Sequence, residues 1–539
     1  MAGGGDVVDV PSGSSIRITT AMLDNILRNG EENPSAVGQE DEGEQKLQRV
    51  RLSYTPTFQR FRAKTRTFTQ QYSHMYTNRL RLMRPMLEAS AQAKWGTGGM
   101  APTLCKKVID LVDGAGTVMV VGTLFKDMPL RPSLLDEYRD EAALQGALQP
   151  AAGPNTNYVS GEDTLVLEDE SGRVSLAGPS LAVGEFVTGL VVAVKGHVEG
   201  GVLTVADVCV AGLPSQEEGP EEGAAVEVEG EGGGGNPRYV LLASGFKLNE
   251  KSDLLPLQML IEYVQGHVGS DAHKRDVVSR IGRLIVAGDL LAPFDDSLLR
   301  EKHMTAKQQE DFALPFKHLD LVLTQLASAV PMDVMPGADD PSNSTLPQQP
   351  IHPCLLPHAA RYASSFHTVP NPYEAWIGGD RLFLGGSGQV PEDMARYMTP
   401  PSLPPSPTSS AARALRLMEK TLEWRHLAPT APDTLACYPF CDDDPFVLPS
   451  LPHVYFVGNQ PAFATSLLEG GGEGGGEGGR VRVVCVPSFA ETGTVVLLEL
   501  NSLTATPLRF GGLPEVMRRE EGEGEEEGEG GGDDMEEEN

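Results

Sequence analysis

The chain has 539 residues, with 43 Lys and Arg against 75 Asp and Glu, and its formal net charge is −32. Twelve of the acids follow Arg519, seven lie in 215–235 and three in 469–479, so these segments with Arg518 and Arg519 carry −20 and the rest of the chain carries −12. A mildly acidic body argues against a surface that grips duplex DNA, because such a surface neutralises phosphates with Lys and Arg. The composition instead favours protein partners.

Length and cysteine usage restrict the class of protein further. A chain of this size supports two or three domains, each with a core of its own. The six cysteines are scattered, without a Cys-x-x-Cys zinc pattern or a regular disulfide framework, which predicts a reducing compartment. The N-terminus lacks a secretory signal pattern, and no apolar run reaches the ~18 residues of a membrane span. We therefore expect a soluble intracellular protein.

The first hundred residues divide into a lead and an arm. Residues 1–45 combine Gly, Pro and Glu with one short apolar patch, which predicts a disordered lead. Residues 46–110 carry spaced apolar side chains between Tyr54 and Trp95, which predicts a helical N-terminal arm. The arginines of the arm could face DNA or pair with acidic neighbours along the body, and we favour the second: Arg79, Arg81 and Arg84. We expect the interleaved rings to be buried anchors: Phe58, Phe61, Phe68, Tyr72 and Tyr76.

Residues 111–212 predict a small closed barrel. Five short apolar runs with hairpin signals lie at 117–125, 163–167, 173–176, 187–198 and 202–210. A small barrel can bind single-stranded nucleic acid through a cationic and aromatic face. These strands supply only Arg173 and Lys195, with no ring at alternating positions. Single-strand binding therefore remains the weaker alternative to a packing role.

The remainder predicts a layered α/β domain between two acidic segments. Residues 213–236 indicate an acidic Gly/Glu loop, and 513–539 an acidic disordered tail. Within 237–512, strand and helix patterns alternate, as in a layered domain. Helices are predicted at 254–268, 316–329 and 412–425, and closing strands at 481–486 and 494–500. The proline-rich loop 399–408 is interpreted as a spacer rather than a docking peptide, and 469–479 is a Gly-rich loop.

Four buried strands are predicted at 239–243, 283–287, 330–335 and 453–457, and each runs into a loop that approaches the pattern of a two-metal phosphoesterase. Such a site uses Asp-x-His, Gly-Asp-x-x-Asp, Gly-Asn-His-Asp/Glu and Gly-His-x-His loops to hold two cations roughly 3.5–4 Å apart. In the first loop a hydroxyl and a ring, Ser244 and Phe246, occupy the Asp and His places. This loop has kept no ligand.

The second and third loops are incomplete as well. Asp289 remains in the second, but Ala292 stands at the bridging Asp position, and a methyl group has no lone pair to offer a cation. In the third loop Ala338 and Asp339 stand for Asn and His. A few separated carboxylates should not hold a dinuclear centre.

In the last loop Asn459 and Pro461 stand where two imidazoles would be needed. An amide oxygen is a poor ligand for the transition metals that such sites favour. We therefore predict no catalytic residue, no metal and no cofactor. The degenerate ligand positions are Ser244, Asp289, Ala292, Ala338, Asp339, Asn459 and Pro461.

Longer motifs around these loops resemble a known family. They are Val330-Pro-Met-Asp-Val-Met-Pro-Gly337, Leu346-Pro-Gln-Gln-Pro-Ile-His-Pro353, Ala431-Pro-Asp-Thr-Leu-Ala-Cys-Tyr-Pro439, Val121-Gly-Thr-Leu-Phe-Lys-Asp-Met-Pro129 and Asn371-Pro-Tyr373. Together they resemble the second (small, B) subunit of replicative DNA polymerase delta over residues 46–512. The acidic and Gly-rich insertions and the long lead depart from that family.

The resemblance implies an OB-fold (oligonucleotide/oligosaccharide-binding) barrel packed on an inactivated calcineurin-like phosphoesterase α/β sandwich. It also implies a nuclear, non-catalytic scaffold subunit of DNA polymerase delta that acts in DNA replication and repair synthesis. The implied partners are the catalytic subunit, through its C-terminal metal-binding region, and a third accessory subunit. DNA would be contacted only indirectly or weakly, and no membrane is implied.

Two alternatives from other functional classes stay open. One is a metal-dependent phosphodiesterase or nuclease that uses Asp289, Asp339 and Asp340 with an unusual ion. The other is a single-stranded DNA binder that uses the barrel. Three histidines are interpreted as structural because no further ligands accompany them: His352, His426 and His453.

Overall fold

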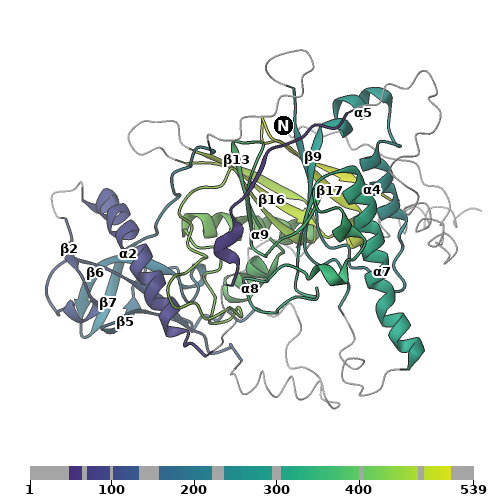
Figure 1. Cartoon of the computed structure of the whole chain (residues 1–539). Helices are drawn as coiled ribbons and strands as arrows, with labels where there is room; N and C mark the ends of the chain where they lie inside the picture. Colours follow the sequence, from purple (N-terminus) through teal and green to yellow (C-terminus); the bar gives the residue numbers. More distant parts are fainter. Residues whose placement is uncertain are drawn as a thin grey trace, which may run out of the picture.

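The computed structural model describes residues 48–63, 69–96, 101–132, 157–220, 236–293, 305–399, 406–470 and 479–511. Figure 1 shows a barrel with its flanking helix α2 at one end and a larger two-sheet sandwich beside it. The predicted lead 1–45 and tail 513–539 lie outside the described residues, as do most of the Gly/Glu loop, the proline-rich loop and the Gly-rich loop. Within the described part, no helix combines the length and apolarity needed to cross a bilayer.

The five strands predicted for the barrel are confirmed: β3 (Val118–Asp127), β4 (Thr164–Asp169), β5 (Gly172–Ala177), β6 (Val191–Glu199) and β7 (Val202–Cys209). The order is β3-β4-β5-β7-β6, and pairing of β3 with β6 closes the sheet. The short strand β2 (Thr103–Cys105) joins β3 in parallel. Alternating side chains fill the interior, including Val120, Leu124 and Leu203.

Helix α2 (Ser73–Trp95) lies along the outer face of the barrel. It buries Leu80, Met83, Leu87, Ala91 and Trp95, whose spacing of three or four residues places them on one helical face. They pack against alternate side chains of β3 and β6: Met119, Val121, Val191 and Ala193. The barrel core also includes residues in α8 (Gln389–Tyr397) and α9 (Pro407–Glu423) or at their C-terminal caps: Met394, Met398, Leu417 and Trp424. Helices therefore hold the barrel on two sides.

The helical arm expected over 46–110 is confirmed at Ser73–Trp95 and is wrong on both sides of this helix, because Thr103–Cys105 form strand β2. Residues Tyr54–Pro56 form β1, which pairs with β12 (Tyr373–Ile377), and Phe58–Phe61 form a single 3-10 turn, η1. Proline disfavours helix at the residue before it, so Pro56 keeps this segment extended. Phe58 and Phe61 are buried anchors as predicted, whereas the Tyr72 residue is 43% exposed. Phe68 lies outside the described residues.

Two six-stranded sheets form the sandwich. One has the order β11-β10-β9-β8-β17-β18, and the other β1-β12-β13-β14-β16-β15. The strands of the first are β8 (Tyr239–Ala243), β9 (Ile281–Ala287), β10 (Met332–Met335), β11 (Phe366–Thr368), β17 (Thr494–Glu499) and β18 (Ala505–Arg509). The second adds β13 (Arg381–Gly386), β14 (Val454–Gln460), β15 (Ala464–Glu469) and β16 (Arg480–Pro487). All four buried strands predicted before the loops are present.

The core follows the two-residue period of the strands. On β8, Val240 and Leu242 belong to the core shared with the second sheet, whereas Leu241 and Ala243 pack under helices α4 (Leu255–Gln265) and α7 (Ala306–Ala329). In Figure 1 these two helices flank the side of the sandwich away from the barrel. Short helical segments complete the described chain: α5 (Asp271–Asp276), α10 (Phe489–Thr492) and the 3-10 turns η2 (Val108–Asp110), η3 (Val183–Glu185), η4 (Val278–Arg280), η5 (Pro353–Leu355) and η6 (Ala359–Arg361).

Two predicted helix boundaries need correction. Helix α7 begins at Ala306, ten residues before the predicted start at 316, because Thr305 and Gln308 form a capping box. The helix continues through Pro315. Helix α9 begins at Pro407, after Ser406, whose side chain accepts the Ser409 N–H. Both starts carry a Ser or Thr cap signal that an apolar-periodicity argument overlooks.

Candidate functional site

The four loops that follow the buried strands converge at one edge of the sandwich. Strands β8, β9 and β10 are parallel, so their carboxyl ends lie at the same edge. The Gly245 N–H donates to the Gly288 carbonyl at 2.9 Å, and the Asn459 N–H donates to Ser244 Oγ at 2.9 Å. A Cβ added to Gly288 would lie 2.7 Å from Gly337 Cα, so glycine permits this close approach. The loops after β8, β9, β10 and β14 therefore lie against one another.

A cavity of about 400 Å³ opens at this edge. Four degenerate ligand positions line it, namely Asp289, Ala338, Asn459 and Pro461. Its other walls come from the loop after β13, from α8 and α9 and from the end of β14. The polar residues of these walls are Ser387, Gln389, Glu392, Ser410, Arg413 and Gln460. The structure therefore places a small pocket beside four of the positions that the sequence pattern singles out.

Ser244 acts as a structural link in the first loop. Its side chain is fully buried, and Oγ lies 2.9 Å from the Pro487 carbonyl, to which it donates, while accepting the Asn459 N–H. The nearby Phe246 ring is buried and packs edge-to-face on Phe489, with centroids 5.7 Å apart. Packing thus occupies the places of the first Asp and His.

Asp340 ties the second loop to the third. Its Oδ1 accepts the N–H groups of Leu290 at 2.9 Å and Leu291 at 3.1 Å, and its Oδ2 accepts the Gly337 N–H at 2.8 Å. Burial raises the pKa of this carboxyl to about 7, although the three amides oppose the shift. Because backbone amides occupy both oxygens, Asp340 fits a loop clamp better than the metal ligand considered in the phosphodiesterase alternative.

Asp289 lines the cavity, and one of its carboxylate oxygens is unpaired among the described residues. Its backbone has φ 52°, in the left-handed region, and the residue is 8% exposed. Among the described residues, Oδ1 has no hydrogen-bond partner. Burial and the charge of Asp339 raise the pKa of Asp289 to about 6, while the backbone amides of Ala338 and Asp339 oppose the rise.

The other acid of the third loop, Asp339, is half-buried at the rim. Burial raises its pKa, and Lys247 opposes this shift. The Lys247 ammonium lies 2.6 Å from a Glu491 carboxylate oxygen. One aspartate at the wall and one at the rim therefore remain from the predicted set.

Asn459 and Ala292 offer little to a cation. Asn459 has φ 58°, and its Nδ2 donates to the carbonyls of Ser387 at 2.7 Å and Ala287 at 3.3 Å. Its Oδ1 is buried and unpaired among the described residues. Ala292 takes part only through its backbone, where its N–H donates to the Leu248 carbonyl at 3.0 Å.

These residues do not fit a dinuclear metal centre. In the described ranges, no group of three or more His, Cys, Asp or Glu side chains is arranged to hold a metal ion. The oxygen atoms of Asp340 are occupied, and Ala292 and Pro461 have no donor side chains. Two neighbouring aspartates with one amide fall short of the ligands that two cations require.

A network of side-chain amides supports the third loop from behind. Asn371 Nδ2 lies 2.8 Å from each of three oxygens, on Gln348, Ser387 and Gln389. Gln348 in turn donates to the Gly337 carbonyl at 2.8 Å. Three of the motifs that carried the family resemblance thus meet here, at Gly337, Gln348 and Asn371, and act structurally. The sequence motifs named these residues, but only the fold shows that they contact one another.

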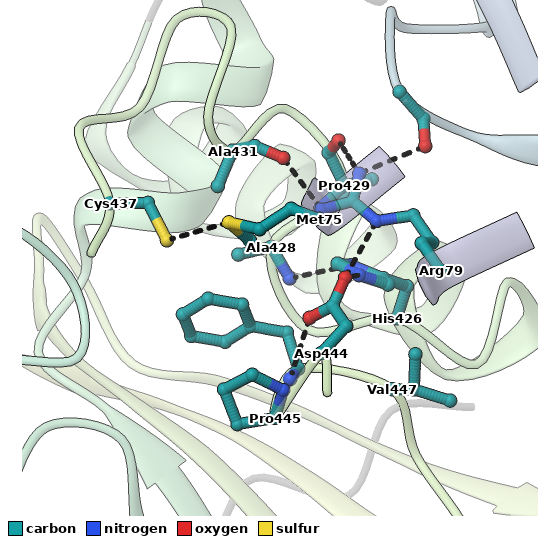
Figure 2. Close-up of polar contacts among 12 residues, drawn as sticks. Met75, Arg79, His426, Ala428, Pro429, Ala431, Cys437, Asp444, Pro445 and Val447 are labelled. Carbon is teal, nitrogen blue, oxygen red and sulfur yellow. Dashed lines mark hydrogen bonds and ion pairs between the residues drawn. The ribbon is translucent and has the colours of Figure 1, made fainter. Parts of the chain in front are cut away.

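A second polar cluster, centred on Arg79, joins the three parts of the molecule (Figure 2). The Arg79 side chain is fully buried, and its Nε donates to Asp444 Oδ2 at 2.8 Å. Its remaining nitrogens donate to the carbonyls of Gly189 in the barrel and of Pro429 and Ala431 in the sandwich, at 2.6–3.0 Å. Helix α2 is thereby bonded to both domains.

Electrostatics match this geometry. Burial alone would raise the pKa of Asp444, but Arg79 and His426 hold it well below its ordinary value. His426 Nε2 lies 2.9 Å from the same Asp444 oxygen, and burial followed by the Arg79 charge lowers the pKa of His426 to about 4. His426 is therefore a neutral, packed residue at neutral pH, in agreement with its structural interpretation.

The other candidate DNA contacts are also engaged with the protein. Arg84 donates to the Lys106 carbonyl at 2.8 Å, and Arg81 donates to the Asp442 carbonyl at 3.4 Å. On the barrel, Arg173 lies 3.2 Å from Glu168, and the Lys195 ammonium lies 6.0 Å from the centroid of the Trp95 ring. The packing prediction is confirmed for Arg79, which is buried and inaccessible to DNA, whereas the Arg173 side chain is 74% exposed.

Comparison with known proteins follows the division into barrel and sandwich. Residues 71–208 match the family model described as the DNA polymerase delta subunit OB-fold domain, and residues 240–465 match the model for the B subunit of DNA polymerases alpha and epsilon. The DNA polymerase delta small subunit of Arabidopsis thaliana is 38% identical over 472 residues, which cover 86% of this chain and 96% of the relative. That of Oryza sativa subsp. japonica is 38% identical over 443 residues, covering 82% and 93%. That of Saccharomyces cerevisiae is 31% identical over 472 residues, covering 83% and 91%.

Proposed function

Because the chain belongs to the family of DNA polymerase delta small subunits, we propose that it is a non-catalytic accessory subunit of this replicative polymerase. It joins the catalytic subunit, through the C-terminal metal-binding region of that subunit, to a third accessory subunit. It acts in the nucleus, in DNA replication and repair synthesis. DNA is contacted indirectly or weakly.

One observation carries the non-catalytic part of the proposal: several of the side chains at the strand ends are engaged within the protein or lack donor atoms, and too few ligands remain for two cations. Asp340 holds three backbone amides, Ser244 links two loops, and Ala292 and Pro461 bring no donor side chain. The two-sheet sandwich, with helices outside and loops at one edge, supports an inactivated calcineurin-like phosphoesterase. Its chemistry is lost while the packing is kept.

The same packing suits a scaffold. Buried contacts bond α2 to the barrel and to the sandwich, so the subunit presents a continuous surface to several partners. A pre-organised surface loses less conformational entropy on binding than a flexible one. Affinity would then come from a few buried apolar and aromatic anchors on the partners.

The first test measures hydrolysis and metal content together. The purified chain is incubated with bis(p-nitrophenyl) phosphate and Mn²⁺ or Mg²⁺, and bound metal is measured by elemental analysis. We expect no turnover and far less than one metal per chain. Near-stoichiometric metal together with hydrolysis that Asp289→Ala abolishes would favour the phosphodiesterase alternative instead.

The second test concerns partners. Co-expression with the catalytic subunit of DNA polymerase delta should yield a complex that coelutes in size exclusion. A monodisperse chain that does not bind this subunit would contradict the scaffold role.

Titration with a labelled single-stranded oligonucleotide at low and moderate salt tests the alternative of single-stranded DNA binding by the barrel. Tight binding that weakens steeply with salt would support a strand binder.

A further inference from the structure

The cavity at the ends of the buried strands combines a buried acid with apolar walls. Its volume of about 400 Å³ lies near the lower end of the range for small-ligand pockets. The apolar lining residues come from α8, α9 and the neighbouring loops: Ala338, Pro391, Ala395, Ala414, Leu417 and Pro461. Asp289 and Asn459 line the same space. A ligand of this cavity would therefore be small and would need an apolar part and a polar part.

The polar wall contains acceptors that the protein itself leaves without donors. Asp289 is 8% exposed, and its Oδ1 has no hydrogen-bond partner in the described ranges. Burial and the charge of Asp339 raise the pKa of Asp289, although the backbone amides of Ala338 and Asp339 oppose this rise. Asn459 Oδ1 is also buried and unpaired in the same part of the chain. A buried carboxylate in this state is compensated by a cation or by N–H donors.

The surrounding charges leave one negative charge in excess. The cations near the cavity are engaged within the protein: Lys247 lies 2.6 Å from Glu491, Arg396 lies 2.9 Å from Glu392, and Arg413 donates to the carbonyls of Ala395 and Met398. These three cations face four carboxylates, namely Asp289, Asp339, Glu392 and Glu491. The N-terminus of α8 at Gly388 and Gln389 adds a partial positive charge of about half a unit, which is too small to cancel the excess. The cavity therefore favours a cationic ligand.

We propose that this cavity binds a cation that carries N–H donors on an aliphatic stem, of the alkylguanidinium or alkylammonium class. The N–H groups donate to the Asp289 carboxylate, and the stem packs on the apolar walls from α8 and α9. A divalent metal ion fits less well, because it requires more oxygen ligands than this wall offers and makes no contact with the apolar walls. The ligand is either a free small molecule or the Arg or Lys side chain of a partner chain, since the two share this chemistry.

A titration with matched probes tests the class of ligand. n-Butylguanidinium is added to the purified full chain at pH 8, and binding is followed by saturation-transfer difference NMR. We expect a Kd on the order of 1 mM, as is typical of a ligand with few non-hydrogen atoms and one charged contact. n-Butyltrimethylammonium has the same charge and stem but no N–H donor, and it should bind at least about 10-fold more weakly. Equimolar Mn²⁺, which has charge without a stem, should not displace n-butylguanidinium.

A conservative variant tests the contact with the carboxylate. Asp289→Asn removes the charge and keeps the shape of the side chain, so it should weaken binding of n-butylguanidinium by about 10-fold or more. Asp110→Asn removes an exposed carboxylate on the barrel, far from the cavity in the sequence and outside its lining, and should leave the affinity unchanged. Circular dichroism of both variants checks that the fold is retained.

The assembled complex distinguishes the two sources of the ligand. The same titration is repeated on the chain co-expressed with the catalytic and third accessory subunits. Unchanged binding of n-butylguanidinium in the complex assigns the cavity to a free small molecule. Loss of probe binding in the complex, together with weaker assembly of Asp289→Asn, assigns it to a side chain of a partner.

Other outcomes overturn the proposal. They are an absence of saturable binding to the isolated chain, an equal affinity for n-butyltrimethylammonium, an equal affinity of Asp289→Asn, and displacement by Mn²⁺. None of these results bears on the proposed function, because the isolated chain is titrated without any polymerase subunit. Failure of the complex to form would overturn the proposed function and leave binding of the probe to the isolated chain as it stands.

Discussion

Asp289 is a buried carboxylate that keeps an acidic side chain at the pocket without the partners of a metal site. Its carboxylate lies so close to Gly337 that a Cβ at position 337 would overlap it. Oδ1 is unpaired among the described residues, and burial raises the pKa of this carboxyl although the amides of Ala338 and Asp339 oppose the rise. Asp340, three residues beyond Gly337, is fully occupied by backbone N–H groups, and burial raises its pKa as well. The two acids therefore differ in their hydrogen bonds rather than in the direction of their pKa shifts.

The raised pKa of Asp289 predicts a pH-dependent effect of Asp289→Asn. The pKa of Asp289 is raised from 3.8 to about 6, so the folded state binds this proton more tightly than the unfolded chain. Its stabilising contribution is present below the unfolded pKa and is lost as pH rises through about 6. Asp289→Asn should be near neutral at pH 4 and should stabilise the protein at pH 8 by on the order of 1–3 kcal/mol. Urea unfolding at the two pH values measures this change.

The control for this experiment is Asp340→Asn. An amide nitrogen there would face one of the three N–H donors, a loss of roughly 1–3 kcal/mol that opposes the gain from removing a buried charge. Asp340→Asn should therefore stabilise the protein at pH 8 less than Asp289→Asn does. Equal effects of Asp289→Asn at both pH values would contradict the raised pKa of Asp289.

Among the elements, α2 connects the rest of the fold. Its apolar face covers β3 and β6, and Arg79 extends from its inner side to the sandwich. The buried side of the helix carries Leu and Met side chains together with the paired charge of Arg79. The helix therefore depends on both the barrel and the sandwich for its packing. Removing one partner of a buried ion pair leaves the other without compensation.

Replacement of Arg79 should therefore be costly. Arg79→Met should lower the free energy of unfolding by about 3–5 kcal/mol, since Asp444 would remain buried without its cation. Arg79→Lys should recover little, because an ammonium cannot reach several carbonyls and a carboxylate from one planar group. Arg81→Ala, which loses one exposed bond of 3.4 Å, is the matched control and should stay within about 0.5 kcal/mol of the parent. Chemical unfolding followed by far-UV circular dichroism measures all three.

On the scale of the whole molecule, the barrel and the sandwich share helices and buried bonds. Met394, Met398, Leu417 and Trp424 of the sandwich belong to the barrel core, and the buried Lys126 of β3 donates to the Tyr397 carbonyl at 2.8 Å. Domains linked by loose interfaces move independently, whereas a buried interface of this kind couples their stability.

Native-state hydrogen exchange tests this coupling. The slowest amides of β3 in the barrel and of β9 in the sandwich should open with the same free energy, within about 1 kcal/mol, because each domain loses part of its core when the other unfolds. In Arg79→Met the two values should diverge. Widely different values in the unaltered protein would show that the domains unfold separately.

The amino-acid sequence alone determined the strands and the missing ligands. Buried strands such as 239–243 and 283–287 are uninterrupted apolar runs, and Ala292 and Pro461 lack donor atoms in any fold. Its motifs also carried the family resemblance, which the relatives bear out. These properties are local, so chain neighbours are enough to define them.

Only the tertiary structure decided which polar groups meet. No spacing rule joins Arg79 to Asp444, 365 residues away, or Asn371 to Gln348 across two loops. The extended course of Tyr54–Pro56 likewise depends on pairing with β12, about 320 residues later in the chain, rather than on local propensity alone. Burial also decided the role of Asp340. Its carboxylate holds two loops together because the fold brings three backbone amides to it and excludes water.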